Sequence, residues 1–218
     1  MATDVPTSRG GHTRSGRPRS DATERAILDA FVDLLLDCGL ARLRLEHVAK
    51  RAGVSKASIY RRWASKEELA LHALGHLADP DARVPDLGNA RADLRAIVTN
   101  AIAELTESQF GRVAAAMLCE IASDADVAHA FRARVIERWH EEIREVTARG
   151  VRRGELDPAT LDDVGAVTAF LLGPVCFRAI FREPLDPAFA AWIVDAFVTV
   201  SQGQAQPREL EAWAPEPT

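Results

Sequence analysis

Apolar residues recur at intervals of three and four through most of the chain, and this spacing restricts the fold to packed helices. The first such run follows Asp21 and contains Ile27, Phe31, Leu34, Leu35 and Cys38. These intervals place side chains on one face of an α-helix, whereas a half-buried strand needs strict alternation. No alternating segment of useful length occurs elsewhere. The sequence therefore predicts an all-α protein.

Capping residues and helix breakers divide the pattern into about nine helices. Ser55 and Ser65 are typical N-caps, and Gly39 and Gly53 each follow the last apolar residue of a helix. The two short helices on either side of Gly53 have the spacing of a helix-turn-helix. The expected helices span residues 21–38, 45–52, 56–63, 66–78, 88–107, 110–122, 126–150, 159–182 and 187–202. This order predicts a small N-terminal bundle followed by a larger one.

Charge separates the same two parts of the chain. The net charge of the 218 residues is −5, but residues 1–75 carry 13 Lys and Arg against 9 Asp and Glu, and the remainder carries a net charge of −9. The chain's three lysines and its single tyrosine, Tyr60, all lie within residues 50–66. A basic unit joined to an acidic body suggests a polyanionic partner for the first unit alone.

The helix expected at 56–63 has two contrasting sides. Ile59 and Trp63 face one side, and the opposite side carries Ala57, Tyr60, Arg61 and Ala64, flanked by Lys56 and Ser58. Small and cationic side chains of this kind suit the major groove, where Arg or Lys reads guanine and a small residue permits close approach. Tyr60 and Lys66 suit phosphate oxygens. The alternative is an ordinary solvated face.

Residues 20–75 resemble the TetR family of bacterial transcriptional repressors. The resemblance rests on Ala22 to Gly39, the run HVAKRAGVSKASIY at His47 to Tyr60, Trp63, and Ser65-Lys66-Glu67. It implies a homodimer that binds operator DNA and a C-terminal domain whose small-molecule pocket, when occupied, releases the DNA. Together with the polar composition of both ends, it divides the chain into a flexible basic arm (1–19), a DNA-binding domain (20–75), a ligand-binding and dimerisation domain (76–203) and a tail (204–218).

The resemblance assigns recognition to Ser55 through Arg61 and phosphate contacts to Tyr60 and Lys66. Arg44, beside Arg42, stands where the family often has a capping Ser or Thr, so the second helix is expected to start uncapped while a longer cation reaches the backbone. Trp63 replaces a usual Phe in the core. The arm could place Arg17 and Arg19 in the minor groove, or it is a solubilising tail. The expected DNA contacts are Arg17, Arg19, Arg42, Arg44, Ser55, Lys56, Ala57, Ser58, Tyr60, Arg61 and Lys66.

The last two helices are apolar on more than one side, which predicts burial against a second subunit as well as the protein's own core. Helix 159–182 carries one stripe with Val164 and a second with Phe170, Pro174, Phe177 and Phe181. The expected dimer interface contains Val164, Val167, Leu171, Val175, Phe189, Trp192, Ile193 and Phe197. A dimer predicts a roughly palindromic operator. The alternative is a monomer with a deeper core.

Aromatic and aliphatic residues on different helices suggest an effector pocket, with an apolar or aromatic ligand. The candidate lining residues are Leu105, Phe110, Val113, Met117, Trp139, Phe170 and Phe177. Each of them also fits an ordinary core position.

Two other function classes compete with a DNA-binding regulator. An enzyme lacks support, because no nucleophile elbow, phosphate-binding glycine loop or zinc-protease motif occurs. His72 and His76 have the spacing of two metal ligands but no third ligand is evident, so no metal, cofactor or catalytic residue is expected. A helical module that binds polyanions without sequence specificity is the second alternative. The absence of a secretory signal and of an uncharged stretch of spanning length predicts a cytoplasmic protein without a membrane segment.

Overall fold

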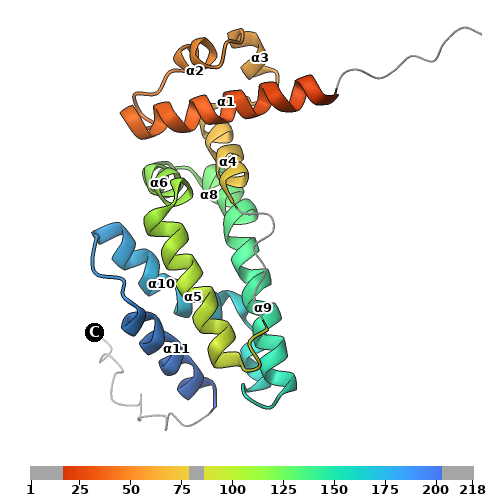
Figure 1. The fold of residues 1–218 in the computed structure, drawn as a ribbon, viewed down its shortest axis with the longest axis vertical. Helices are drawn as coiled ribbons and strands as arrows, with labels where there is room; N and C mark the ends of the chain where they lie inside the picture. Colours follow the sequence, from red (N-terminus) through yellow and green to blue (C-terminus); the bar gives the residue numbers. More distant parts are fainter. Residues whose placement is uncertain (1–16, 79–85, 203–218) are drawn as a thin grey trace, which may run out of the picture.

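The computed structural model describes residues 17–78 and 86–202, and all regular structure within them is helical (Figure 1). The prediction of an all-α fold is confirmed. The N-terminal bundle comprises α1 (Arg17–Cys38), α2 (Leu45–Arg51) and α3 (Lys56–Tyr60), and α4 (Lys66–Leu77) leads from it toward the rest of the chain. The second bundle contains α5 (Ala90–Glu107), α6 (Gln109–Ala116), α7 (Leu118–Ser123), α8 (Ala125–Phe131), α9 (Glu137–Arg152), α10 (Val164–Phe181) and α11 (Pro187–Ser201).

Helix α1 begins earlier than the sequence pattern indicates. It starts at Arg17, so residues 17–19, which were expected in the arm, are helical. Pro18 permits this, because a helix can hold proline in its first turn, where the backbone N–H has no intrahelical acceptor. Residues 1–16 of the arm and the tail from 203 onward lie outside the described residues.

Two of the expected helices are interrupted. The segment expected at 110–122 divides at Met117 into α6 and α7, and the segment expected at 126–150 contains a π-helical turn, Arg132–Ile136, between α8 and α9. A third difference lies before α10, where a 3-10 turn at Pro158–Leu161 precedes a true N-cap, Asp163, whose carboxylate accepts from the Ala166 N–H at 2.8 Å. Aspartate favours this capping position over a helix interior.

Helix α5 is the centre of the second bundle and packs against α6, α9, α10 and α11 (Figure 1). Helix α4 packs on α1 in the first bundle, and on α6, α8 and the π-helical turn in the second. The same buried cluster runs from Phe31 and Trp63 in the first bundle to Leu94 and Val194 in the second. The two bundles therefore share one continuous core, with α4 as the connection.

The structure buries most of the residues that the sequence placed at a dimer interface on α10 and α11. The stripe of Val164, Val167, Leu171 and Val175 is buried within the protomer, and so are Ile193 and Phe197. A side chain already covered by its own protomer offers little area to a partner, so these six residues have little surface left for a second subunit. Trp192 stays exposed, at 64%, and Phe189 is half-buried. The outward stripe instead contains Phe170, Phe177, Ile180, Phe181, Trp192 and Val200.

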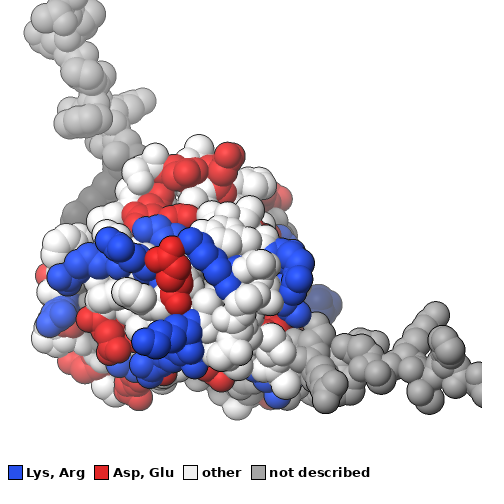
Figure 2. All heavy atoms as spheres, turned by 90° about the horizontal axis from the view of Figure 1, so that it is seen from above, with Lys and Arg blue, Asp and Glu red and all other residues white. Residues whose placement is uncertain are grey.

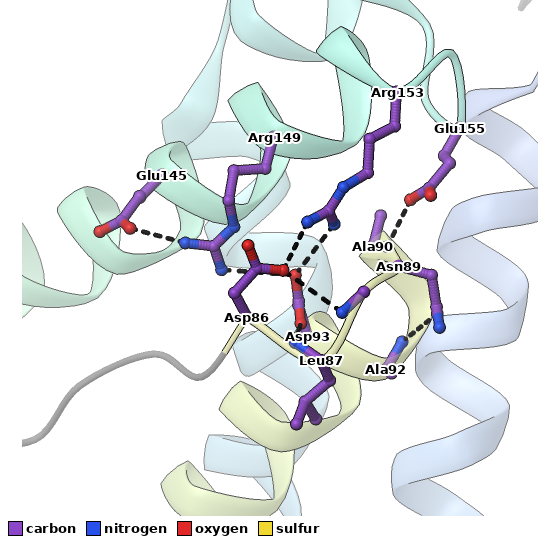
Figure 3. A network of polar contacts seen from close by, with 11 residues as sticks. Asp86, Leu87, Asn89, Ala90, Ala92, Asp93, Glu145, Arg149, Arg153 and Glu155 are labelled. Atoms are coloured by element: carbon purple, nitrogen blue, oxygen red, sulfur yellow. Dashed lines mark hydrogen bonds and ion pairs between the residues drawn. The ribbon is translucent and has the colours of Figure 1, made fainter.

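A buried carboxylate fixes the start of α5 to the end of α9 (Figure 3). Asp93 is fully buried; one oxygen accepts the Leu87 N–H at 2.7 Å, and the other lies 3.3 Å from Arg149 and 3.5 Å from Arg153. Glu155 also accepts the Ala90 N–H at 2.5 Å. Because the surrounding donors pair the charge of Asp93, the segment that enters α5 is held at a defined position on α9.

We expect Asp93→Ala to lower the free energy of unfolding by about 3 kcal/mol, because it leaves the largely buried guanidinium of Arg149 without its interior carboxylate. Urea denaturation followed by circular dichroism measures the change. Asp33→Ala is the matched control, since Asp33 pairs with Arg51 at 2.7 Å with both side chains about half exposed, and its loss should be barely resolvable. Equal losses in the two variants would contradict the anchoring role of Asp93.

Candidate nucleic-acid interface

Helix α3 is held in place by one capped end and two buried side chains. The Ser55 hydroxyl accepts the Ser58 N–H at 3.2 Å, as predicted for an N-cap. Gly53 provides the turn before it with a φ of +67°, in the left-handed region that favours glycine. Ile59 and Trp63 are 0% and 1% exposed, which confirms the predicted inner side. The opposite side of α3 is therefore directed away from the core.

That outer side carries the predicted groove-facing residues. Ala57, Tyr60, Arg61 and Ala64 are exposed together with Lys56, while Ser58 is half-buried. The Arg61 guanidinium donates to the Ser58 hydroxyl at 3.2 Å. The Lys56 ammonium lies 5.7 Å from the centre of the Tyr60 ring. The structure thus brings small, hydroxyl-bearing and cationic side chains together on α3 and the turn that follows it.

Between α2, α3 and the start of α4 lies an open hollow of about 390 Å³. Its walls include Arg44, Lys56, Tyr60, Ser65 and Lys66. Three cations beside two hydroxyl groups are a set that binds phosphate oxygens. When the molecule is viewed from this end, Lys and Arg side chains extend across the face with acidic side chains between them (Figure 2).

The start of α4 has the predicted capping arrangement. Ser65 accepts the Glu68 N–H at 3.1 Å, and the Glu68 carboxylate accepts the Ala64 N–H at 2.7 Å, one residue earlier than a standard capping box. Lys66 donates to the Leu40 carbonyl at 2.8 Å, which links α4 to the turn after α1. This contact holds the Lys66 ammonium at the edge of the hollow.

The remaining predicted contacts divide into three groups. Arg44 is exposed at the N-cap of α2 and makes no side-chain cap, which confirms that this helix starts uncapped. Arg42 is also exposed, but its Nε donates to the Cys38 carbonyl at 3.1 Å and so closes the end of α1. Arg17 and Arg19 lie in the first turn of α1, and their side chains are outside what the structure describes.

Sequence reasoning missed Glu46, an exposed residue in the first turn of α2. Its carboxylate lies 2.5 Å from the Lys56 ammonium and lines the hollow among the cations. The hydrogen bond and the charge of Lys56 lower the pKa of the Glu46 carboxyl, with smaller contributions from Arg44 and His47, so it is ionised at neutral pH. The ten-residue separation of Glu46 and Lys56 follows no helical interval, and only the helix-turn-helix geometry brings them together.

The candidate pocket residues separate into two groups. Phe110, Val113, Met117 and Trp139 are buried in the core of the second bundle, and Leu105 is partly buried against it. Phe170 and Phe177 lie on the exposed side of α10, where the Phe177 and Phe181 rings are 4.7 Å apart. The two exposed phenylalanines therefore belong to the outward stripe and not to an internal pocket of this protomer.

The two histidines considered as metal ligands have separate partners. His72 packs edge-on against Trp63, with ring centres 5.9 Å apart, and burial lowers the pKa of its imidazole. His76 lies 3.6 Å from Asp29 on α1. Within residues 17–78 and 86–202, no cluster of three His, Cys, Asp or Glu residues is placed to hold a metal ion.

One helix of the described chain, α10, has the length and composition needed to cross a membrane, with a mean hydropathy of 1.9 over 18 residues. This span includes Arg178, so the uncharged stretch within it stays shorter than a membrane crossing requires. Leu171 and Val175 on this helix are fully buried among the other helices of the second bundle. One side of α10 is therefore packed within the protomer, and the other side carries Phe177 and Phe181.

Comparisons with known proteins agree with this geometry. Residues 27–73 match the family model for bacterial regulatory proteins of the tetR family, and residues 84–197 match the model for a tetracyclin repressor-like C-terminal domain. The uncharacterized HTH-type transcriptional regulator YdeS of Bacillus subtilis is 29% identical over 195 residues, which cover 88% of this chain and 97% of YdeS.

Two solved structures extend the match to the fold. The TetR family transcription regulator SCO0332 is 32% identical, with a TM-score of 0.62 over 81% of this chain and 96% of that one. The transcriptional regulator FadR from Bacillus subtilis, solved in complex with stearoyl-CoA, is 15% identical with a TM-score of 0.62 over 80% and 97% of the two chains. At this low identity, the similarity to FadR supports a shared fold only. With matches over both bundles, the chain belongs to the TetR family and is a DNA-binding transcriptional regulator.

Proposed function

We propose that this protein is a cytoplasmic, ligand-responsive repressor that binds a palindromic operator as a homodimer. The observation that carries the proposal is the outer side of α3, where Tyr60, Arg61 and Lys56 surround the small Ala57. The inner side of the helix is buried against the protein core. In this proposal α3 enters the major groove, and Lys66 and Arg44 contact the flanking phosphates. A C-terminal domain of the tetracyclin repressor-like type supports repression as the outcome.

Base contacts and phosphate contacts are expected to differ in their sensitivity to sequence. We expect Arg61→Ala to reduce discrimination between an operator selected from random duplexes and a scrambled duplex by about 1–3 kcal/mol. Lys66→Gln should weaken binding to both duplexes similarly and reduce the salt slope by about 1. Fluorescence anisotropy across a salt series measures both effects, and cooperative melting confirms folding. Binding equal on all sequences in the unmodified protein would instead favour a non-specific polyanion binder.

The outward stripe on α10 and α11 supports the dimer. Phe177, Phe181 and Trp192 are each more than half exposed, and the Phe189 and Trp192 rings stack with centres 6.2 Å apart. A group of large exposed aromatics on adjacent helices is costly to leave in water, so a second copy of the same surface is the expected cover. Pairing two α10–α11 surfaces would bring four helices together and set the separation of the two α3 helices.

We expect Phe177→Ser combined with Trp192→Ser to convert a dimer into a monomer at micromolar concentration, as measured by sedimentation velocity. Leu87→Ser is the matched control, because Leu87 is 55% exposed, close to the 56% of Phe177, and lies outside α10 and α11. The control should remain dimeric. An unmodified protein that is monomeric both free and on DNA would refute the proposed assembly.

The effector is proposed to enter the second bundle among Leu105, Phe110, Met117 and Trp139, and to be apolar or aromatic. FadR, of the same fold, was solved with a long-chain acyl thioester, which supports a ligand role for this bundle. Helix α4 would transmit occupancy, because it contacts α6 and α8 in the second bundle and begins at Lys66 beside the hollow. Coupling of this kind is reciprocal, so ligand and DNA must each weaken the other's binding.

We expect a compound that binds this core to raise the melting temperature and to weaken operator binding by 5- to 150-fold, the usual range of allosteric coupling. Stearoyl-CoA and a panel of planar aromatic compounds are suitable probes, with thermal shift to detect binding and anisotropy to measure DNA affinity. Met117→Trp, which fills the proposed site, should abolish the thermal shift for the same compound. Equal operator affinity with and without a bound compound would overturn the proposed regulation.

A further inference from the structure

The hollow beside α3 contains an acid in a place where a DNA-binding surface is expected to be cationic. Among the described residues that line it, Glu46 is the acidic one, against Arg44, Lys56 and Lys66. Glu46 comes from α2 and Lys56 from the start of α3, and their charged atoms are 2.5 Å apart. Both side chains are about half exposed, so water and a ligand can reach the pair.

The ion pair with Glu46 engages the Lys56 ammonium, which is a cation that DNA would otherwise contact. An ammonium that donates to a carboxylate at this distance must give up or share that partner before it can bind a phosphate oxygen. The Lys56 ammonium also lies over the Tyr60 ring, which restricts where it can move. A duplex that approaches the hollow therefore meets an ionised carboxylate as well as an engaged lysine.

We propose that Glu46 competes with DNA phosphates for Lys56 and thereby reduces the affinity of this surface for duplexes that offer Lys56 no base contact. The proposal rests on the assignment of α3 to the major groove. On an arbitrary sequence, Lys56 exchanges a carboxylate for a phosphate and gains little, while the Glu46 carboxylate repels the backbone. On the operator, guanine acceptors reached by Lys56 offset that loss. Glu46 is therefore a positioning residue that raises specificity by weakening non-specific binding.

This role has a signature in the salt dependence of binding. Each additional phosphate neutralised steepens the slope of log affinity against log salt by about 0.9 for duplex DNA. If Glu46→Gln frees Lys56 for one phosphate, binding to a scrambled duplex should tighten by up to about 15-fold at 50 mM salt and about 4-fold at 200 mM. The preference for the selected operator over the scrambled duplex should fall at the same time.

A double-mutant cycle separates competition for Lys56 from a general effect of negative charge. Anisotropy with a labelled scrambled duplex is measured for Glu46→Gln, Lys56→Gln and the double variant at 50, 100 and 200 mM salt. The gain from Glu46→Gln should vanish when Lys56→Gln is present. Asp33→Asn is the matched control, because the Asp33–Arg51 pair has an exposure similar to that of the Glu46–Lys56 pair. The change in duplex affinity caused by Asp33→Asn should be the same with and without Lys56→Gln.

Each outcome decides the matter. No gain from Glu46→Gln, or an equal gain with and without Lys56→Gln, overturns the inference while leaving the DNA-binding role intact. If the unmodified protein binds no duplex at 50 mM salt, both the proposed DNA contacts of α3 and this inference are wrong. Melting of every variant confirms that the fold persists, which is expected because exposed ion pairs contribute little to stability.

Discussion

The burial of Ile59 and Trp63 beneath α3 is the constraint on which the DNA-facing surface depends. A helix of five residues is too short to be stable by itself, so α3 takes its position from these two side chains, from the Ser55 cap and from the turn at Gly53. Once the inner side is fixed, the helical repeat leaves Ala57, Tyr60 and Arg61 no orientation except outward. The outward direction of this surface is thus a consequence of packing.

The same logic of anchoring applies at the opposite end of the molecule. The Asp93 cluster fixes the start of α5 on α9, so the helix at the centre of the second bundle has a defined base. Helix α4 connects this bundle to the DNA-facing one, and its packing on α6 and α8 gives a physical route between the two. In the proposed regulation, a ligand that displaced α6 would act on the position of Lys66 through the packed side chains of α4.

The sequence predicted what local signals determine and missed what tertiary contacts determine. The caps at Ser55 and Ser65 and the inner side of α3 depend on neighbours within a few residues, and these predictions are confirmed. The choice between two apolar stripes on α10 depends on which one meets α5 and α9, and periodicity gives both equal standing, so the sequence alone could not tell which stripe the protomer buries. The π-helical turn at 132–136 shifts the register without a compositional marker. The Glu46–Lys56 pair joins two helices whose angle no spacing rule supplies.

Cross-linking from the centre of α3 tests the account most directly. An Ala57→Cys variant is incubated with a selected operator that carries a disulfide-activated thiol tether on one base at a time, and the unmodified protein controls for Cys38, Cys119 and Cys176. If α3 enters the major groove, adducts should form at one or two neighbouring bases of each half-site, with the tether on the major-groove edge of the base, and none should form on a scrambled duplex. Adducts spread evenly over all positions, or formed equally on both duplexes, would contradict it.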